Sequence, residues 1–153
     1  SEGEQVLIHH PGAAAVVPLL SDIAGEDPQL LLIKQYRYAT GDYLWEIPAG
    51  RLEDNERPED CALRELLEEF GCHCTTLTPL TAIWTAPGFT NEKIHLFAAR
   101  GLTQGATARE ADEFMEVVPM PMSRALLMIR DGEISDAKTI AAILYVAGFT
   151  GVL

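Results

Sequence analysis

The segment from Pro58 to Phe70 is the strongest helix candidate in the chain, and it constrains what can pack around it. Pro58 suits the first turn of a helix, and Gly71 can adopt the left-handed conformation that ends one. The apolar side chains between them recur at helical spacing and form a single stripe, made of Ala62, Leu63, Leu66, Leu67 and Phe70. We therefore expect a helix that buries one face in a core.

Three carboxylates occupy another face of the same helix. Glu65, Glu68 and Glu69 stand at positions i, i+3 and i+4, which places them on one side of the helix and close together. Like charges this close raise each other's pKa and destabilise the helix. The helix alone leaves two interpretations open. The face is either solvated, or it binds a divalent cation such as Mg²⁺ or Mn²⁺, which prefers oxygen ligands.

Composition favours a single folded domain over residues 1–153. Hydrophobic residues make up 48% of the chain and charged residues 22%, a balance that argues against disorder. The formal net charge of −12 disfavours nucleic-acid binding, because phosphate contacts require a positive surface. An acidic chain that acts on phosphates needs a cation between its carboxylates and the substrate.

Cysteine usage and hydropathy bear on the location of the protein. Cys61, Cys72 and Cys74 lack the spacing of a disulfide framework and fit reduced thiols. The run Cys72-His73-Cys74 lacks a second ligand pair, so it does not predict a zinc site. No apolar run is long enough to span a bilayer, and no signal-peptide pattern opens the chain. We expect a cytoplasmic protein with neither a membrane nor a nucleic-acid partner.

The rest of the chain alternates between strand and helix patterns. Residues 13–20 and 29–34 are apolar runs separated by a turn, and they predict a hairpin of buried strands. Further strands are expected at residues 44–47, 82–85, 93–100 and 115–120. Two closing helices are expected at residues 124–130, capped by Ser123, and 136–147, capped by Ser135. This order predicts an α/β sandwich with a mixed sheet.

The spacing of charged residues around the first helix is highly specific. A glycine is followed after five residues by a glutamate, after seven more by Arg-Glu, and then by Glu-Glu and a closing glycine: Gly50, Glu56, Arg64, Glu65, Glu68, Glu69 and Gly71. This pattern resembles the Nudix box at every fixed charged and glycine position. The one departure is Cys72, where the box usually ends in a larger aliphatic residue. The resemblance implies a Nudix α/β/α sandwich with a mixed β-sheet, and a hydrolase that cleaves diphosphates.

The resemblance also implies a metal site. Glu65 and Glu69 would be the principal ligands of Mg²⁺ (or Mn²⁺), with Glu68 assisting directly or through water. The carbonyl oxygen of Ala49 would complete the ligand shell, and Gly50 would let the backbone approach the metal. A metal bound in this way neutralises phosphate charge and lowers the pKa of a bound water molecule.

Two further groups complete the implied catalytic machinery. Arg64 would orient the glutamates, and Glu56 would pair with Arg64 and hold the loop against the helix. An ordinary surface salt bridge is the alternative for this pair. The general base is expected on the acidic segment 109–113, with Glu113 favoured over Glu110 and a solvated turn as the alternative.

Segments outside the box resemble the ADP-ribose pyrophosphatase branch of the family. They are residues 35–37, 45–50, 86–92, 95–97 and 136–139. The resemblance implies metal-dependent hydrolysis of a nucleoside-diphosphate sugar, ADP-ribose to AMP and ribose 5-phosphate. A Nudix enzyme for another nucleotide or a dinucleoside polyphosphate is one alternative. A non-catalytic nucleotide sensor is the other, and it is disfavoured because every acidic box position is occupied.

Substrate contacts are expected at Arg37, Glu46, Gly50, Phe89 and Glu92. Arg37 can pair its planar fork with phosphate. Glu46 and Glu92 can hydrogen-bond to the substrate or remain solvated edge groups, and Phe89 can stack on a base or fill the core. Enzymes of this branch usually carry a longer N-terminal region that exchanges across a dimer. We therefore expect a homodimer, with residues 1–9 as a candidate remnant of that region.

Overall fold

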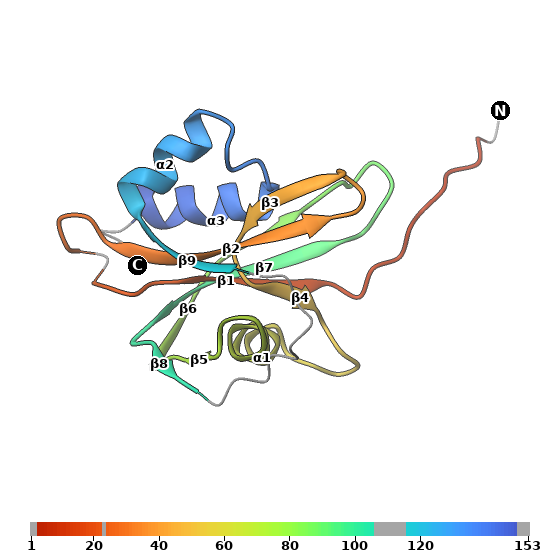
Figure 1. Cartoon of the computed structure of the whole chain (residues 1–153). Helices are drawn as coiled ribbons and strands as arrows, with labels where there is room; N and C mark the ends of the chain where they lie inside the picture. Colours follow the sequence, from red (N-terminus) through yellow and green to blue (C-terminus); the bar gives the residue numbers. More distant parts are fainter. Residues whose placement is uncertain (1–2, 23, 106–115, 150–153) are drawn as a thin grey trace.

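The computed structural model describes residues 3–22, 24–105 and 116–149, which form three layers. In Figure 1, helix α1 (Pro58–Phe70) lies below the strands, while α2 (Met122–Arg130) and α3 (Ala137–Gly148) lie above them. The strands are β1 (Ala13–Pro18), β2 (Gln29–Arg37), β3 (Asp42–Glu46), β4 (Ala49–Arg51), β5 (Cys72–His73), β6 (Thr76–Trp84), β7 (Lys93–Arg100), β8 (Thr103–Gln104) and β9 (Glu116–Pro121). This is the predicted α/β/α arrangement.

The strands form two main sheets and a small third one. The four-stranded sheet has the order β4-β1-β7-β6, in which β1 and β7 are parallel and the other neighbours are antiparallel. The three-stranded sheet has the order β3-β2-β9 and is antiparallel, and β5 pairs with β8. The parallel pair makes the larger sheet mixed, as the sequence predicts.

Strand β1 is the centre of the fold because both of its faces are buried. Ala13, Ala15 and Val17 belong to the core that includes α2 and α3, while Ala14 and Val16 belong to the core that includes α1. Alternate residues of a strand point to opposite faces, so one strand supplies both cores. A strand buried on both sides reads as a continuous apolar run in the sequence.

The predicted hairpin of residues 13–20 and 29–34 is wrong. Strands β1 and β2 belong to different sheets. Beyond the end of β1, an isolated antiparallel bridge joins Leu19 to Leu30, and the Leu20 N–H donates to the Gln29 carbonyl at 2.8 Å. An apolar run that is buried on both faces carries no pattern that could identify its partner. The sequence also does not predict the short strands β4, β5 and β8, or the first part of β6, residues 76–81.

The predicted caps of α2 and α3 are also wrong. Ser123 lies inside the first turn of α2, where its N–H and its hydroxyl donate to the Asp27 carboxylate at 3.0 and 2.7 Å. The cap of α3 is Asp136 and not Ser135, because Asp136 Oδ2 accepts the Thr139 N–H at 3.1 Å. Ser123 binds the distant Asp27 instead of capping α2. At α3, the neighbouring Asp136 provides the cap that the sequence predicts for Ser135.

Helix α1 agrees with its predicted bounds. Gly71 adopts a φ of 65° and ends the helix, and its N–H donates to the carbonyl groups of Leu66 and Leu67. The predicted apolar stripe is narrower than expected, since Leu63 is 40% exposed, while Cys61 is buried instead. The helix presents its glutamates on the side that faces β4, which places them at one edge of the larger sheet.

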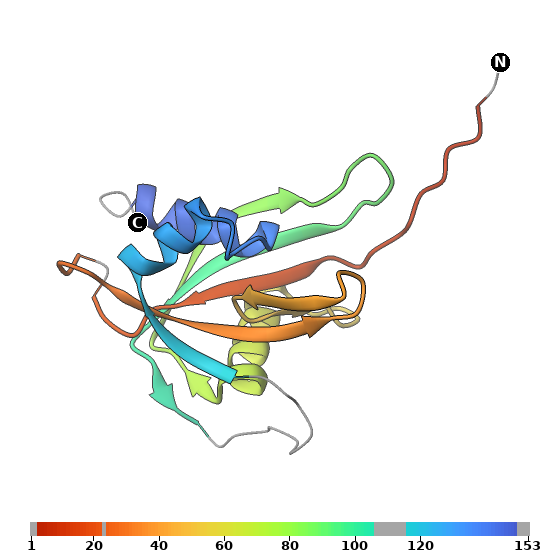
Figure 2. The same cartoon turned by 45° about the horizontal axis from the view of Figure 1, so that its top comes forward.

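The N-terminal segment, residues 3–12, extends away from the layers (Figures 1 and 2). It is attached through Ile8, which forms a bridge with Thr90 and donates its N–H to the Phe89 carbonyl at 2.7 Å. Val6 and Leu7 on this segment are exposed. Within the described residues, every helix is too short or too polar to cross a membrane.

Candidate active site

Helix α1 packs against β4, and this contact brings Gly50 onto Glu65. A Cβ built on Gly50 would lie 1.7 Å from Glu65 Oε1, so any other residue would displace that carboxylate. Glu65 is only 8% exposed. The thiol of Cys61 lies between the helix and the strand and donates to the Gly50 carbonyl at 3.5 Å. The glycine is therefore required by the close approach of strand and helix.

Arg64 joins the loop after β4 to the glutamates of α1. Its Nε and Nη2 donate to Glu56 at 2.8 and 3.0 Å, and its Nη1 donates to Glu65 at 2.7 Å and Glu68 at 3.3 Å. Nη2 also donates to the carbonyl of Arg51 at 3.0 Å. The hydrogen bonds that Arg64 donates to Glu56 lower the pKa of Glu56 to about 2. One guanidinium therefore holds three carboxylates and the backbone of β4 in a fixed arrangement.

Glu69 is half-buried and is bound to the backbone of β4. Its Oε2 accepts the Ala49 N–H at 3.0 Å, which ties α1 to β4 a second time. Burial and the nearby charge of Glu65 raise the pKa of Glu69 to about 8. Burial also raises the pKa of Glu65, although the charge of Arg64 opposes this rise. Two neighbouring carboxyl groups thus resist ionisation unless a cation offsets their charge.

The chemistry of these donors fits a hard divalent cation. Glu65, Glu68 and Glu69 offer only oxygen, which Mg²⁺ and Mn²⁺ prefer. Within the described residues, no three acidic, histidine or cysteine side chains are gathered around a common point. Arg64 donates to Glu65 and Glu68, and the Ala49 N–H donates to Glu69. A cation at this site would have to compete with Arg64 for Glu65.

A cavity of about 210 Å³ lies beside this cluster. It is lined by Ala13, Arg37, Ala49, Gly50, Arg51, Glu92, Ile94 and Lys138. Two larger cavities, of about 430 and 490 Å³, lie near the C-terminal end of α1 and beside the N-terminal segment, and neither is lined by a charged residue. Of these three cavities, the smallest is suited to a charged ligand, because it combines Arg37, Arg51 and Lys138 with Gly50, the glycine next to Glu65.

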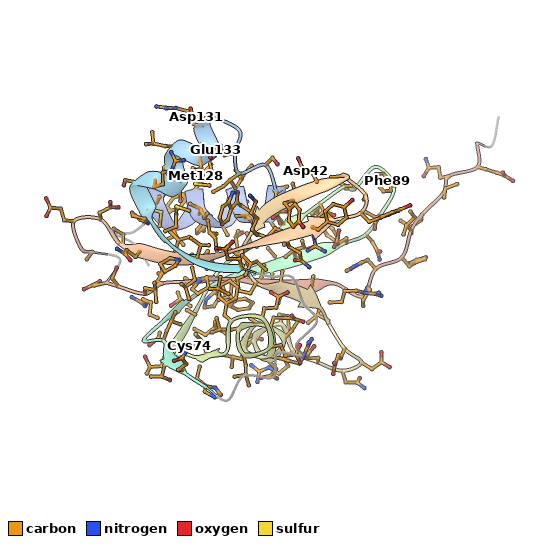
Figure 3. All side chains as sticks on the ribbon, in the orientation of Figure 1. Asp42, Cys74, Phe89, Met128, Asp131 and Glu133 are labelled. Carbon is orange, nitrogen blue, oxygen red and sulfur yellow. The ribbon has the colours of Figure 1, made fainter. Side chains whose placement is uncertain are left out.

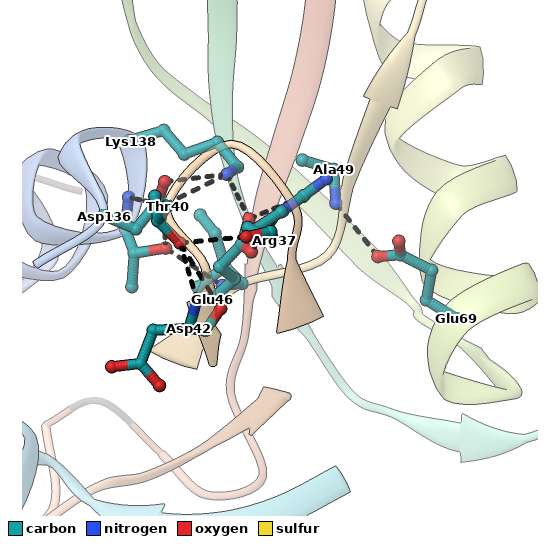
Figure 4. A network of polar contacts seen from close by, with 10 residues as sticks. Arg37, Thr40, Asp42, Glu46, Ala49, Glu69, Asp136 and Lys138 are labelled. Atoms are coloured by element: carbon teal, nitrogen blue, oxygen red, sulfur yellow. Dashed lines mark hydrogen bonds and ion pairs between the residues drawn. The ribbon is translucent and has the colours of Figure 1, made fainter. Parts of the chain in front are cut away.

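A polar network lies across from α1 (Figure 4), and two of its residues, Arg37 and Lys138, line the cavity. Glu46 Oε2 accepts from Arg37 Nε at 2.7 Å, and Oε1 accepts from Arg37 Nη2 at 2.8 Å and Lys138 Nζ at 2.6 Å. Lys138 Nζ also contacts both carboxylate oxygens of Asp136, at 3.1 and 3.0 Å. Burial alone would raise the pKa of Glu46, but Arg37 and Lys138 outweigh it and hold the pKa below its ordinary value.

This network bears directly on the residues expected to contact substrate. Glu46 is 1% exposed, so its interpretation as a solvated edge group is wrong. Both of its oxygens already bind cations, which makes it an anchor for Arg37. Arg37 lines the cavity with its side chain 43% exposed, and Gly50 lines it too. These positions are compatible with the predicted contacts of Arg37 and Gly50.

Glu92 and Phe89, also expected to contact substrate, lie in different surroundings. Glu92 lines the cavity, where the Thr85 hydroxyl donates to its Oε2 at 2.7 Å and His10 Nε2 lies 3.4 Å from its Oε1. Phe89 is 54% exposed at the outer end of the loop between β6 and β7 (Figure 3), so its interpretation as a core residue is wrong. The candidate bases Glu113 and Glu110 lie outside the described residues.

Sequence reasoning overlooked several side chains at this site. The sequence marks Lys138 only as part of residues 136–139, which resemble the ADP-ribose pyrophosphatase branch. No nearby motif marks His10 or Thr85 as site residues. Lys138 lies 92 residues from its partner Glu46, and spacing along the chain cannot reveal such a contact. Cys61 could have been noticed, since it lies on the same helix as the glutamates, one turn before Glu65.

A family model described as the NUDIX domain matches residues 9–143, so the chain belongs to the Nudix family. An ADP-ribose pyrophosphatase of Bacillus subtilis (strain 168) is 40% identical over 141 residues, which cover 91% of this chain and 74% of that protein. A methanol dehydrogenase activator of Bacillus methanolicus is 37% identical over 141 residues, with the same coverage of 91% and 74%.

A solved structure has a similar fold. The structure of an ADP compounds hydrolase superposes with a TM-score of 0.80 at 25% identity, and covers 92% of this chain and 73% of that one. The predicted fold, family and class of enzyme, a Nudix pyrophosphohydrolase that resembles the ADP-ribose pyrophosphatase branch, are therefore confirmed. The names of the relatives differ, so the substrate has to be argued from the site.

Proposed function

We propose that this enzyme hydrolyses ADP-ribose to AMP and ribose 5-phosphate with Mg²⁺ or Mn²⁺ as cofactor. The observation that carries the proposal is the contact between Gly50 and Glu65, beside a cavity lined by cations. This contact supports the proposal because it puts the buried carboxylate of Glu65 next to a cavity lined by cationic side chains. The ADP-ribose pyrophosphatase among the similar proteins supports the choice of substrate.

The reaction adds water across a phosphoanhydride bond. The oxygen of water forms a bond to one phosphorus atom, the bond from that phosphorus to the bridging oxygen breaks, and the other phosphate keeps the bridging oxygen. A divalent metal bound by Glu65, Glu68, Glu69 and the Ala49 carbonyl would supply charge neutralisation and a more acidic water molecule. Arg64 would keep these glutamates oriented.

Other residues would bind the substrate and accept the proton. Arg37 would pair with a phosphate, since Glu46 fixes two of its nitrogens and its third, Nη1, has no bonding partner among the described residues. Glu92 would accept a hydrogen bond from a sugar hydroxyl, and Phe89 would stack on the base. We propose Glu113, and after it Glu110, as the general base that takes the proton from water.

The proposal extends to the assembly and its location. We expect a homodimer, because the N-terminal segment presents Val6, Leu7 and Ile8 to solvent and can bury them against a second copy. We expect the cytoplasm, because the spacing of Cys61, Cys72 and Cys74 lacks a disulfide framework and fits reduced thiols. Sedimentation measurements across a range of protein concentrations would test the dimer.

The test of the activity is a substrate panel. The protein would be incubated with Mg²⁺ and, in separate reactions, with ADP-ribose, GDP-mannose, diadenosine polyphosphates and nucleoside triphosphates, and the products resolved by chromatography. ADP-ribose should give AMP and ribose 5-phosphate with the highest kcat/KM. Faster hydrolysis of another nucleotide sugar would reject ADP-ribose as the substrate but keep the chemistry. No hydrolysis with either metal would reject catalysis and favour a nucleotide sensor.

A further inference from the structure

Arg51 lines the cavity of about 210 Å³ and follows Gly50, the glycine that contacts Glu65. Because neighbouring residues of a strand face opposite ways, Gly50 faces α1 while Arg51 faces the side of the cavity. Arg51 is paired in register with Ala13, which is paired in turn with Ile94. These three residues form one row across the sheet. All three residues line the cavity.

The side chain of Arg51 has no bonding partner among the residues that the structure describes. Its carbonyl oxygen accepts from Arg64, but no hydrogen bond or ion pair of its guanidinium is present. All other arginines in the described ranges have a side-chain partner, namely Arg37, Arg57, Arg64, Arg100, Arg124 and Arg130. In a chain with 23 acidic residues against 11 Lys and Arg, an unpaired guanidinium is an exception that needs a reason.

The charges around the cavity indicate what Arg51 can bind. Lys138 is neutralised by Glu46 and Asp136, and Arg37 gives two of its three nitrogens to Glu46. The cationic groups left without a carboxylate are therefore the guanidinium of Arg51 and Nη1 of Arg37. They belong to different sheets and line the same cavity of about 210 Å³. Two guanidinium groups that come from different sheets and line one cavity suit an anion with several oxygens, such as a diphosphate.

We infer that Arg51 binds a phosphate of the substrate, opposite Arg37, and so helps to select diphosphate compounds. This inference rests on the proposed function for its substrate but not for its chemistry, because any bound diphosphate would need the same contact. The alternative is a solvated arginine that protects an edge strand, since β4 lies at the edge of its sheet. The two readings differ in whether removal of the guanidinium weakens the binding of phosphate.

The experiment measures binding without turnover. Titration calorimetry in EDTA would compare ADP, ADP-ribose and adenosine as ligands of the wild-type protein, Arg51→Gln and Arg51→Lys. Losing a charge-assisted hydrogen bond should weaken ADP and ADP-ribose about tenfold or more and leave adenosine unchanged. Arg51→Lys should recover part of the loss, since it keeps the charge but not the planar fork. Because the Arg51 side chain has no hydrogen bond or ion pair with the described residues, all variants should unfold at the wild-type temperature.

Arg130→Gln is the matched control, since Arg130 lies on α2, away from the cavity, with its side chain 68% exposed. Equal affinities for ADP in Arg51→Gln and Arg130→Gln would overturn the inference, even if the wild-type enzyme hydrolyses ADP-ribose. Conversely, loss of ADP affinity in Arg51→Gln would support the inference even if the substrate panel selects a different nucleotide. A wild-type protein that binds adenosine as tightly as ADP would also overturn it.

Discussion

Glu46 and Lys138 form an ion pair of 2.6 Å although 92 residues separate them in the chain. Glu46 is 1% exposed and the side chain of Lys138 is 12% exposed, so both charges are largely removed from water. Arg37 completes the compensation of the carboxylate, and Asp136 that of the ammonium. The N-terminal turn of α3 is thereby fixed to the end of β3. A second contact, from the Ile47 N–H to Thr139 Oγ1 at 3.1 Å, lies beside it.

Replacing Lys138 with methionine should destabilise the fold. The substitution leaves the buried Glu46 carboxylate with Arg37 as its only cation, and an undercompensated buried charge costs about 2 kcal/mol or more. Urea unfolding would measure the loss. Arg124→Gln is the control, because its partner Glu133 is 47% exposed and such a pair contributes less than about 1 kcal/mol. Equal losses in the two variants would mean that the buried pair has no special weight.

Gly50→Ala should lower activity more than stability. The new methyl group would occupy the place of Glu65 Oε1, so the carboxylate has to turn away from its present position. Because displacement of one catalytic group is costly, kcat for the substrate should fall about a hundredfold. Gly148→Ala is the control, since no atom lies within 4 Å of the added carbon in this helical position. Wild-type kcat in Gly50→Ala would remove the reason for glycine at this site.

The metal-free protein should lose stability as the pH rises from about 4.5 to 8. In the unfolded chain the carboxyl group of Glu69 titrates near 4.5, and in the folded chain near 8. Between these values the folded state retains a proton that the unfolded state has lost. The stabilisation is therefore complete below pH 4.5 and is lost as the pH rises through 8. The slope is on the order of 1 kcal/mol per pH unit.

Thermal unfolding in EDTA between pH 5 and 8.5 would measure this dependence. In Glu69→Gln the slope should be much smaller, because the group that titrates is gone. Glu133→Gln, which changes an exposed carboxylate on the opposite layer, should keep the wild-type slope. A metal-free wild-type protein that becomes more stable over this range would show that Glu69 is ionised in the fold without a cation.

The parts of the site that lie on one continuous segment could be predicted from the sequence, and those assembled from distant segments could not. The box from Gly50 to Gly71 is local, so its spacing identified α1, its C-terminal cap and the arginine and glutamates that now stand together. The contacts of Glu46 with Lys138, and of Glu92 with Thr85 and His10, depend on how sheets and helices pack, which no spacing encodes. The predicted hairpin of residues 13–20 and 29–34 is wrong for the same reason, because the sequence of a fully buried strand does not show which strand it pairs with.

Divalent metal should stabilise the wild-type protein through Glu65 and Glu69. A ligand that binds only the folded state raises the unfolding temperature as its concentration increases, and the gain is about 2.7 kcal/mol at a hundred times Kd. Thermal shifts measured with Mg²⁺ and Mn²⁺ at pH 8 should be clear in the wild type and much reduced in Glu65→Gln and Glu69→Gln. Metal-free Glu69→Gln should be at least as stable as the wild type at this pH, because burial disfavours the charge of Glu69.

Glu53→Gln is the matched control, since Glu53 lies in the box loop with its side chain 72% exposed and should retain the full shift. Shifts of wild-type size in both glutamine variants would show that the metal does not bind to α1, and would reject the proposed chemistry.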